Sequence, residues 1–345
     1  MTDCSTSPKV SIAPMMDWTD RHCRYFMRLL SPSVRLYTEM ITAAALQHGD
    51  ASRLLAFHES EHPVALQLGG SDPTSMADAA RLGWNHGYDE ININVGCPSD
   101  RVQSGSFGAC LMSRPELVAE CVRAMRQACD VPVTVKTRIG IDHHDSYDFV
   151  RHFIEVIADA GCRIFVVHAR IAILSGLSPR DNRTVPPLNY DRVYRLKQAF
   201  PELTIILNGG ISSVEQAREH LTHLDGVMIG RQAYQHPWFL AELENQFGDP
   251  DDAIHQGMSR FDVVDGMLPY IEGELSRGAY LKHITRHMLG LFAGQPGARA
   301  WRRYLSENAH RPGAGPEVIE QALRQLPQAD DGRALRQART RRTVC

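Results

Sequence analysis

Ile-Asn-Ile-Asn-Val-Gly-Cys-Pro, at residues 91–98, reads as a β-strand that ends abruptly. Ile91, Ile93 and Val95 alternate onto one face, and the strand stops where glycine permits an unusual turn and proline cannot continue a ladder. Cys97 is therefore expected just past the carboxyl end of a strand. A cysteine in such a turn can be an inert packing residue or a reactive group. The other strand ends of the chain favour the reactive group.

Seven further short apolar runs resemble this one, and helical stretches lie between them. The expected strands are residues 10–14, 34–37, 64–68, 90–95, 133–137, 164–168, 204–208 and 226–229. The expected helices are residues 21–30, 72–86, 115–129, 147–160, 190–200 and 214–221. This alternation over about 240 residues predicts an α/β fold, a (β/α)8 TIM barrel. A doubly wound sheet also alternates, but its first turn typically reads Gly-x-Gly-x-x-Gly, whereas this turn is Pro14-Met15-Met16.

The composition, with 43% hydrophobic and 22% charged residues in 345, is that of an ordinary globular protein. The chain begins without the pattern of a secretory signal, and it has no apolar run of about 18 residues. Eight cysteines lack a Cys-x-x-Cys pair, which indicates reduced thiols, and sixteen histidines show no metal-binding spacing. We therefore expect a cytoplasmic protein, a monomer, with no membrane span and no metal.

Charge is distributed unevenly along the chain. Residues 271–345 carry 13 Lys and Arg against 7 Asp and Glu, whereas residues 1–270 have a net charge of −9. Apolar residues at helical spacing from Met258 to Leu326 predict a small helical bundle. We expect a barrel domain at residues 1–247, a helical domain at 248–326 and a basic, flexible tail at 327–345. The basic part either binds a polyanion or is a solvated surface.

Polar residues and glycines follow the expected strands, and in such a barrel the active site is built at the carboxyl ends of the strands. Asn208-Gly209-Gly210 and Gly230-Arg231 follow the last two strands, where this fold commonly binds a phosphate. Gln67, Lys136 and His168 would then face the other end of the ligand. An amide and a cation suit the pyrimidine edge of a flavin. A phosphorylated substrate without flavin remains the alternative on these residues alone.

Several motifs in the order found here resemble those of the tRNA-dihydrouridine synthases. They are Ala13-Pro14-Met15, Gln67-Leu68-Gly69, the Asn-Val-Gly-Cys-Pro stretch ending at Pro98, Val135-Lys136-Thr137-Arg138, Val167-His168-Ala169-Arg170, Asn208-Gly209-Gly210-Ile211 and Ile229-Gly230-Arg231. The resemblance covers residues 10–325. Residues 172–179 with Asn182-Arg183, and residues 296–299 with Trp301-Arg302-Arg303, resemble the A subfamily.

The resemblance implies an enzyme that uses bound FMN and the reductant NADPH to reduce uridine at positions 20 and 20a of the tRNA D-loop. It implies FMN contacts at Pro14, Met15, Met16, Gln67, Lys136, His168, Asn208, Gly209, Gly210, Gly230 and Arg231. Hydride addition at C6 of uracil requires an acid that protonates C5, and a thiol with an ordinary pKa of about 8.5 can serve. Cys97 is the predicted proton donor. Asn94 is placed to bind the base, and Arg180, Arg183, Arg299 and Arg302 are predicted tRNA contacts.

Two other functions fit part of these observations. A flavin barrel that acts on a free pyrimidine, as dihydroorotate dehydrogenases do, would share the site but has no use for a basic helical domain. An RNA-binding module without catalysis would share the basic domain but has no use for Cys97, Lys136 and His168.

Overall fold

The computed structural model describes residues 9–99, 105–248 and 257–327, and the chain divides into two compact units, Met1–Met258 and Ser259–Cys345. The described part of the first unit is a parallel barrel with helices around it, which confirms the predicted TIM barrel. Its strands are β1 (Val10–Ile12), β2 (Leu36–Tyr37), β3 (Ile41–Thr42), β4 (Val64–Gly69), β5 (Glu90–Val95), β6 (Val133–Arg138), β7 (Ile164–His168), β8 (Thr204–Asn208) and β9 (Gly226–Ile229).

The strands follow the order β1-β9-β8-β7-β6-β5-β4-β2, with β3 a short addition that pairs with β4. Between β1 and the residue before β2, backbone bonds close the ring. The N–H of Ile12 donates to the carbonyl of Arg35 over 2.9 Å, and the N–H of Arg35 donates to that of Val10 over 3.2 Å. The carboxyl ends of all strands consequently meet at one mouth.

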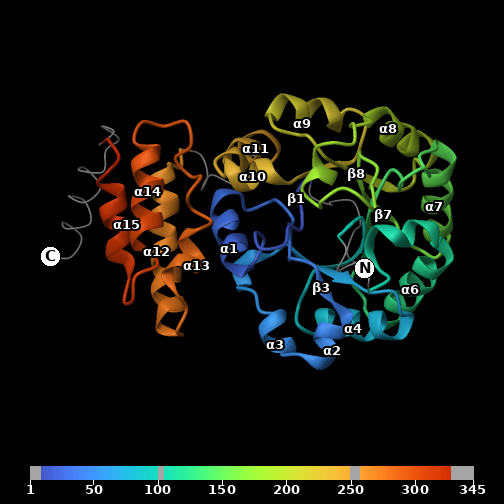
Figure 1. Cartoon of the computed structure of the whole chain (residues 1–345), viewed down its shortest axis with the longest axis horizontal. Coiled ribbons are helices and arrows are strands. Elements are labelled where there is room, and N and C mark those ends of the chain that lie inside the picture. Colours follow the sequence, from blue (N-terminus) through green and yellow to red (C-terminus); the bar gives the residue numbers. More distant parts are fainter. Residues whose placement is uncertain (1–8, 100–104, 249–256, 328–345) are drawn as a thin grey trace. The chain divides into compact units, whose positions relative to one another are not determined.

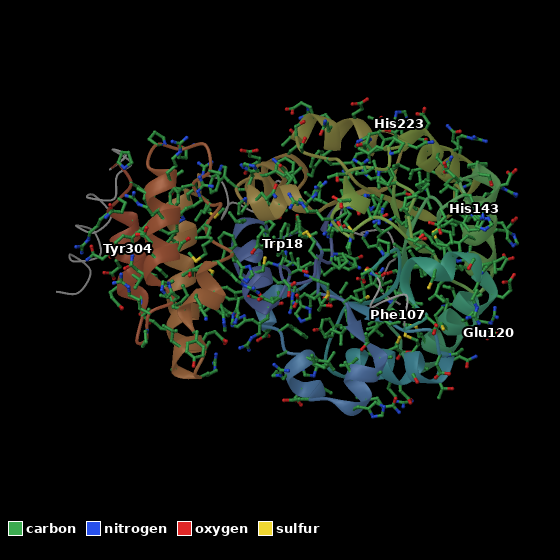
Figure 2. The ribbon with its side chains drawn as sticks, in the orientation of Figure 1. Trp18, Phe107, Glu120, His143, His223 and Tyr304 are labelled. Atoms are coloured by element: carbon green, nitrogen blue, oxygen red, sulfur yellow. The ribbon has the colours of Figure 1, made fainter. Side chains whose placement is uncertain are left out.

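Helices form a ring around the strands (Figure 1). The ring contains α1 (Arg21–Leu30), α4 (Pro73–Asn85), α6 (Pro115–Ala128), α7 (Tyr147–Asp159), α8 (Tyr190–Ala199), α9 (Val214–Leu221), α10 (Arg231–Gln235) and α11 (Phe239–Phe247). Glu120, His143 and His223 lie on the outer rim of this ring, where polar side chains meet solvent (Figure 2). The apolar faces of the helices cover the strands, whose own residues are almost all buried.

The expected strands and helices match the observed ones within a few residues, because each is a distinct apolar run or has a distinct cap. Asp72, for example, accepts from the N–H of Ser75 over 2.8 Å and starts α4 as predicted. The sequence did not predict β3, α2 (Ala43–His48), α3 (Ala51–Leu54), α10 or α11. All of these except α11 have two to six residues, which is too short to show a periodicity. α11, with nine residues, was missed although it is longer.

The described part of the second unit is a helical bundle, as its apolar spacing predicted. It contains α12 (Arg260–Ser276), α13 (Leu281–Thr285), α14 (Ala298–Asn308) and α15 (Pro316–Leu323). Trp301 is fully buried, and its indole N–H donates to the carbonyl of Met288 over 3.2 Å. Residues 328–345, which include nearly all of the expected tail, lie outside the described residues.

No helix of the described residues is both long and apolar enough to span a membrane. Nor do those residues contain a group of three or more His, Cys, Asp and Glu side chains that could hold a metal ion.

Candidate active site

A cavity of about 550 Å³ opens at the carboxyl ends of the barrel strands. This volume falls within the roughly 300–1,000 Å³ of sites for small molecules and cofactors. Its walls come from the ends of β1, β4, β5, β6, β7, β8 and β9 and from the loops that follow them.

Fourteen of the residues predicted from the sequence line this cavity. They are Pro14, Met15, Met16, Gln67, Asn94, Cys97, Lys136, His168, Arg183, Asn208, Gly209, Gly210, Gly230 and Arg231. Arg180 does not line it, although Pro179 and Arg183 on the same loop do. Arg299 and Arg302 belong to α14 in the second unit, where both are exposed.

Other lining residues were not assigned from the sequence. They include Asp17, Met40, Arg138, Ser99, Gln232 and Gln235. Arg138 had a detectable signal, because it follows Lys136 by two residues in the same strand and so shares its face. Met40 and the two glutamines come from segments whose position at the mouth depends on the tertiary fold.

Hydrogen bonds on both sides hold the backbone of Cys97. Its N–H donates to Oδ1 of Asn94 over 3.0 Å, and its carbonyl accepts from the N–H of Ala109 over 2.9 Å. The same Asn94 oxygen accepts from the N–H of Gly96 over 3.1 Å. The thiol is half-buried, 3.4 Å from Oγ of Ser99. The backbone of the turn that ends β5 is therefore held in place, and Cys97 on this turn lines the cavity.

The electrostatics of the cavity favour an anionic ligand. Burial, together with the nearby charges of Arg138 and Arg183, lowers the pKa of Lys136 to about 7. The Nζ of Lys136 donates to Oδ1 of Asn208 over 3.0 Å. Burial and the same cationic surroundings hold the pKa of His168 well below its ordinary value, so the imidazole is neutral at pH 7. Among the described lining residues, Asp17 is the only carboxylate.

Two glycines after β8 bring the backbone close to the cavity. Gly209 and Gly210 have φ angles of 118° and 78°, which side-chain-bearing residues rarely adopt. A Cβ on Gly209 would lie 2.7 Å from the ring of His168, and one on Gly210 would lie 2.5 Å from the hydroxyl of Tyr190. Only glycine fits this turn, which leaves main chain rather than side chains facing the ligand.

Arginine side chains fix the loop that follows β7, which contains η3 (Asp181–Arg183). Arg138 donates to the carbonyls of Asn182, over 2.8 Å, and Gly96, over 3.1 Å. Arg231 donates to the carbonyl of Arg183 over 3.1 Å, and Arg170 donates to that of Pro186. These bonds tie the loop to the strand ends and keep the exposed side chain of Arg183 at the mouth of the cavity.

A TIM barrel with a thiol, a lysine of lowered pKa and a glycine turn at its mouth defines a barrel enzyme that binds an anionic cofactor or substrate. The family model described as dihydrouridine synthase matches residues 11–327. A tRNA-dihydrouridine(20/20a) synthase of Vibrio cholerae is 59% identical over 327 residues, covering 94% of this chain and 99% of the relative. An enzyme of the same name from Salmonella typhimurium is 61% identical, covering 92% of this chain and 94% of the relative. The one from Escherichia coli is 59% identical, covering 94% of this chain and 93% of the relative.

The chain belongs to the dihydrouridine synthase family, which confirms the resemblance found in its motifs. Members of this family are flavin-dependent oxidoreductases. The relatives named above carry the name of the A subfamily, to which the features around Arg183 and Arg302 pointed.

Proposed function

We propose that this protein is a tRNA-dihydrouridine synthase that reduces uridine at positions 20 and 20a to 5,6-dihydrouridine, with FMN as the bound cofactor and NADPH as the reductant. The observation that carries the proposal is one cavity in which Cys97, Lys136, His168 and the Gly209–Gly210 turn meet, in a chain 59% identical to a tRNA-dihydrouridine(20/20a) synthase. Since the substrate is tRNA, we place the enzyme in the cytoplasm.

The donor set of the cavity fits FMN. The Gly209–Gly210 turn and Arg231 suit a phosphate, because main-chain N–H groups and a guanidinium both donate to its oxygens. Gln67 and Lys136 suit the pyrimidine edge of the isoalloxazine ring, where an amide can donate and accept and a cation favours negative charge. When bound, the flavin supplies the hydride that is added to C6 of uracil.

Cys97 supplies the proton in the proposed reaction. Addition at C6 leaves negative charge on C5 and O4 of the base, and a positioned acid completes the reduction by protonating C5. The half-buried thiol lines the cavity on a turn held from both sides. Asn94 uses one Nδ2 proton for Gln67 and its Oδ1 for the turn, so the second Nδ2 proton is available for a ligand. We propose that Asn94 donates this proton to the base.

Reaching a base inside folded tRNA requires flipping it out of its stack, at a cost of a few kcal/mol that contacts with the RNA must offset. We propose that Arg180 and Arg183 at the mouth of the barrel contribute these contacts. The helical domain at residues 248–326 is proposed to supply the others through Arg299 and Arg302. Both are exposed on α14, whose Trp301 and Leu305 are buried.

Replacing Arg299 or Arg302 by glutamate is expected to weaken tRNA binding roughly three- to tenfold at low salt. The salt slope should fall by about 0.7–0.9 for each phosphate that the variant no longer neutralises. Electrophoretic or fluorescence titrations at several salt concentrations measure both quantities. Arg123→Glu is the matched control, because Arg123 is exposed on α6 and its replacement changes the net charge equally. Affinity unchanged across salt in both α14 variants would remove these arginines from the interface.

The proposed function is tested by an anaerobic experiment. The purified protein is reduced with NADPH, mixed with tRNA that lacks dihydrouridine, and followed by the return of oxidised-flavin absorbance. Reoxidation by that tRNA, but not by orotate or free uridine, is the expected result. Bound flavin that responds to orotate and not to tRNA would favour the free-pyrimidine function instead. Absence of flavin from the protein would contradict both.

A further inference from the structure

A chain of buried polar side chains runs through the barrel from the turn at Cys97 to the start of β5. Its members are Asn94, Gln67, Asn92, Thr134 and Glu90. The successive bonds are 2.8 Å from Asn94 to Gln67, 2.8 Å from Gln67 to Asn92, 2.8 Å from Asn92 to Thr134 and 2.7 Å from Thr134 to Glu90. All five side chains are at most 9% exposed. The barrel register brings them together, since Gln67 lies opposite Asn92, and Asn92 opposite Thr134.

Every proton in this chain is donated in the same direction, toward Glu90. Nδ2 of Asn94 donates to Oε1 of Gln67, and Nε2 of Gln67 donates to Oδ1 of Asn92. Nδ2 of Asn92 then donates to the hydroxyl of Thr134, whose own proton goes to Oε1 of Glu90. An amide or a hydroxyl can be turned either way, so the direction must be imposed at the ends.

The Asn94 end of the hydrogen-bond chain can only donate. There Oδ1 of Asn94 accepts from the backbone N–H groups of Gly96 and Cys97, and a backbone N–H has no other role. If Asn94 were turned over, its amide hydrogens would face two N–H groups. The two bonds from Asn94 to the turn that carries the thiol therefore form only while the hydrogen-bond chain runs toward Glu90.

The Glu90 end of the hydrogen-bond chain can only accept. The carboxylate of Glu90 is 1% exposed and pairs with the guanidinium of Arg35 over 2.5 Å. It also accepts from the hydroxyl of Tyr37 over 2.6 Å. Burial and the charge of Glu90 raise the pKa of Tyr37 well above its ordinary value, so the phenol keeps its proton and donates it. An ionised carboxylate with these donors has no proton to give to Thr134.

The direction of the chain also determines what Gln67 offers to a ligand in the cavity. Oε1 of Gln67 accepts from Asn94 and one Nε2 proton goes to Asn92, so one lone pair and one proton are left for the cavity. Turning the amide over would exchange the donor and acceptor edges that face the ligand.

We propose that Glu90, which does not line the cavity, is a positioning residue for the reaction. Its carboxylate imposes the direction of the hydrogen-bond chain, and the chain holds the Cys97 turn and the amide of Gln67 in the orientation that proton transfer and ligand binding require. The inference rests on the proposed function, because it assigns Glu90 to the step that Cys97 performs there.

Glu90→Gln tests the proposal, because an amide of the same shape must aim either its NH2 group or its oxygen at Thr134. If the glutamine oxygen faces Thr134, the NH2 group faces the guanidinium of Arg35, and two donors oppose each other. If the NH2 group faces Thr134 instead, it donates to the hydroxyl, and the direction of the hydrogen-bond chain tends to reverse. Hydrogen exchange of the flavin-free protein should show the amides of Gly96 and Cys97 exchanging about tenfold faster, the effect of losing one hydrogen bond. The single-turnover rate of the reduced enzyme with tRNA should fall by about the same factor.

Glu61→Gln is the matched control. Glu61 is likewise buried and pairs with Arg24 over 2.6 Å, but it is not part of this chain. Its replacement should lower stability without a selective change at Gly96 and Cys97 or in the turnover rate. If both variants change the two amides and the rate equally, or if Glu90→Gln changes neither, Glu90 is only structural and the proposal is wrong.

A second pair of variants decides the matter if Glu90→Gln does not fold. Thr134→Val breaks the chain but keeps the pair of Glu90 with Arg35, whereas Thr134→Ser keeps the hydroxyl. The valine variant should show the faster exchange and slower turnover, and the serine variant should stay close to wild type. Equal behaviour of the two would overturn the proposal. If the wild-type enzyme itself does not turn over tRNA, the proposed function fails, and the exchange data alone then decide whether Glu90 holds the turn.

Discussion

Cys97→Ala is expected to slow dihydrouridine formation on tRNA by about 10²–10⁴-fold, the usual contribution of a positioned general acid. Alanine leaves the backbone bonds of residue 97 to Asn94 and Ala109 in place, so the turn keeps its shape and only the proton donor is lost. Single-turnover reoxidation of the NADPH-reduced enzyme by tRNA lacking dihydrouridine measures the effect directly. Flavin content and the rate of reduction by NADPH should stay near the wild-type values.

Cys110→Ala is the control for this experiment. Cys110 is also half-buried and close in sequence, with its thiol bonded to the carbonyl of Phe107, but it does not line the cavity. Its replacement should leave turnover intact. Loss of flavin from Cys97→Ala would assign Cys97 a structural role, and turnover at the wild-type rate would require another proton donor.

Lys136→Met is expected to abolish tight flavin binding and yet stabilise the flavin-free protein. The pKa of Lys136 falls from an ordinary 10.5 to about 7 because the ammonium group is buried beside Arg138 and Arg183 with little compensating negative charge. Each pKa unit corresponds to about 1.4 kcal/mol, and relaxation around the group reduces the measured cost. We expect a gain of roughly 1–3 kcal/mol in the free energy of unfolding at pH 7.

The same lysine predicts a pH dependence of stability. Between pH 7 and pH 10.5 the unfolded chain keeps the Lys136 proton and the folded, flavin-free protein releases it. Stability rises with pH wherever the unfolded state binds more protons, so this group makes the flavin-free protein more stable as the pH rises through that window. Below pH 7 the folded protein carries the full free-energy cost of burying the charged Lys136. In Lys136→Met this contribution disappears, and the advantage of the variant should shrink from pH 7 to pH 9.

Urea unfolding of both flavin-free proteins at pH 7 and pH 9 measures these differences, and titration with FMN measures the loss of binding. Lys282→Met, a change at an exposed lysine, should alter neither. A destabilised Lys136→Met protein, or one that still binds FMN tightly, would contradict the assignment of Lys136 to the ligand.

Much of the fold could be read from the sequence because a parallel barrel is built from continuous apolar strands. The bounds of β5, β7, β8 and β9 agree with the expected ones. The ends of these strands were the useful signal, since a residue at the carboxyl end of a barrel strand faces the mouth whatever its neighbours are. Cys97, His168 and Asn208 could therefore be assigned to the site before any contact between them was known.

Residues that act through their neighbours could not be assigned in this way. Arg138 was visible as part of a motif, but its role depends on carbonyls of Gly96 and Asn182, one before it and one far after it in the chain. The loop held by Arg138 could be predicted to reach the mouth of the barrel, whereas the bonds that fix it there could not. Short elements such as α3 were missed for a different reason, since four residues show no periodicity.

The sequence by itself determined the order of the main strands and of most barrel helices, most of the residues at the mouth of the barrel and the membership of the family, because each depends on residue type and spacing along the chain. Only the tertiary structure decided which side chains meet and which way their protons point. The chain from Glu90 to Cys97 joins three strands through amides and a hydroxyl that could each face either way. Their direction is set by a carboxylate at one end and backbone N–H groups at the other, which only the folded barrel brings into one line.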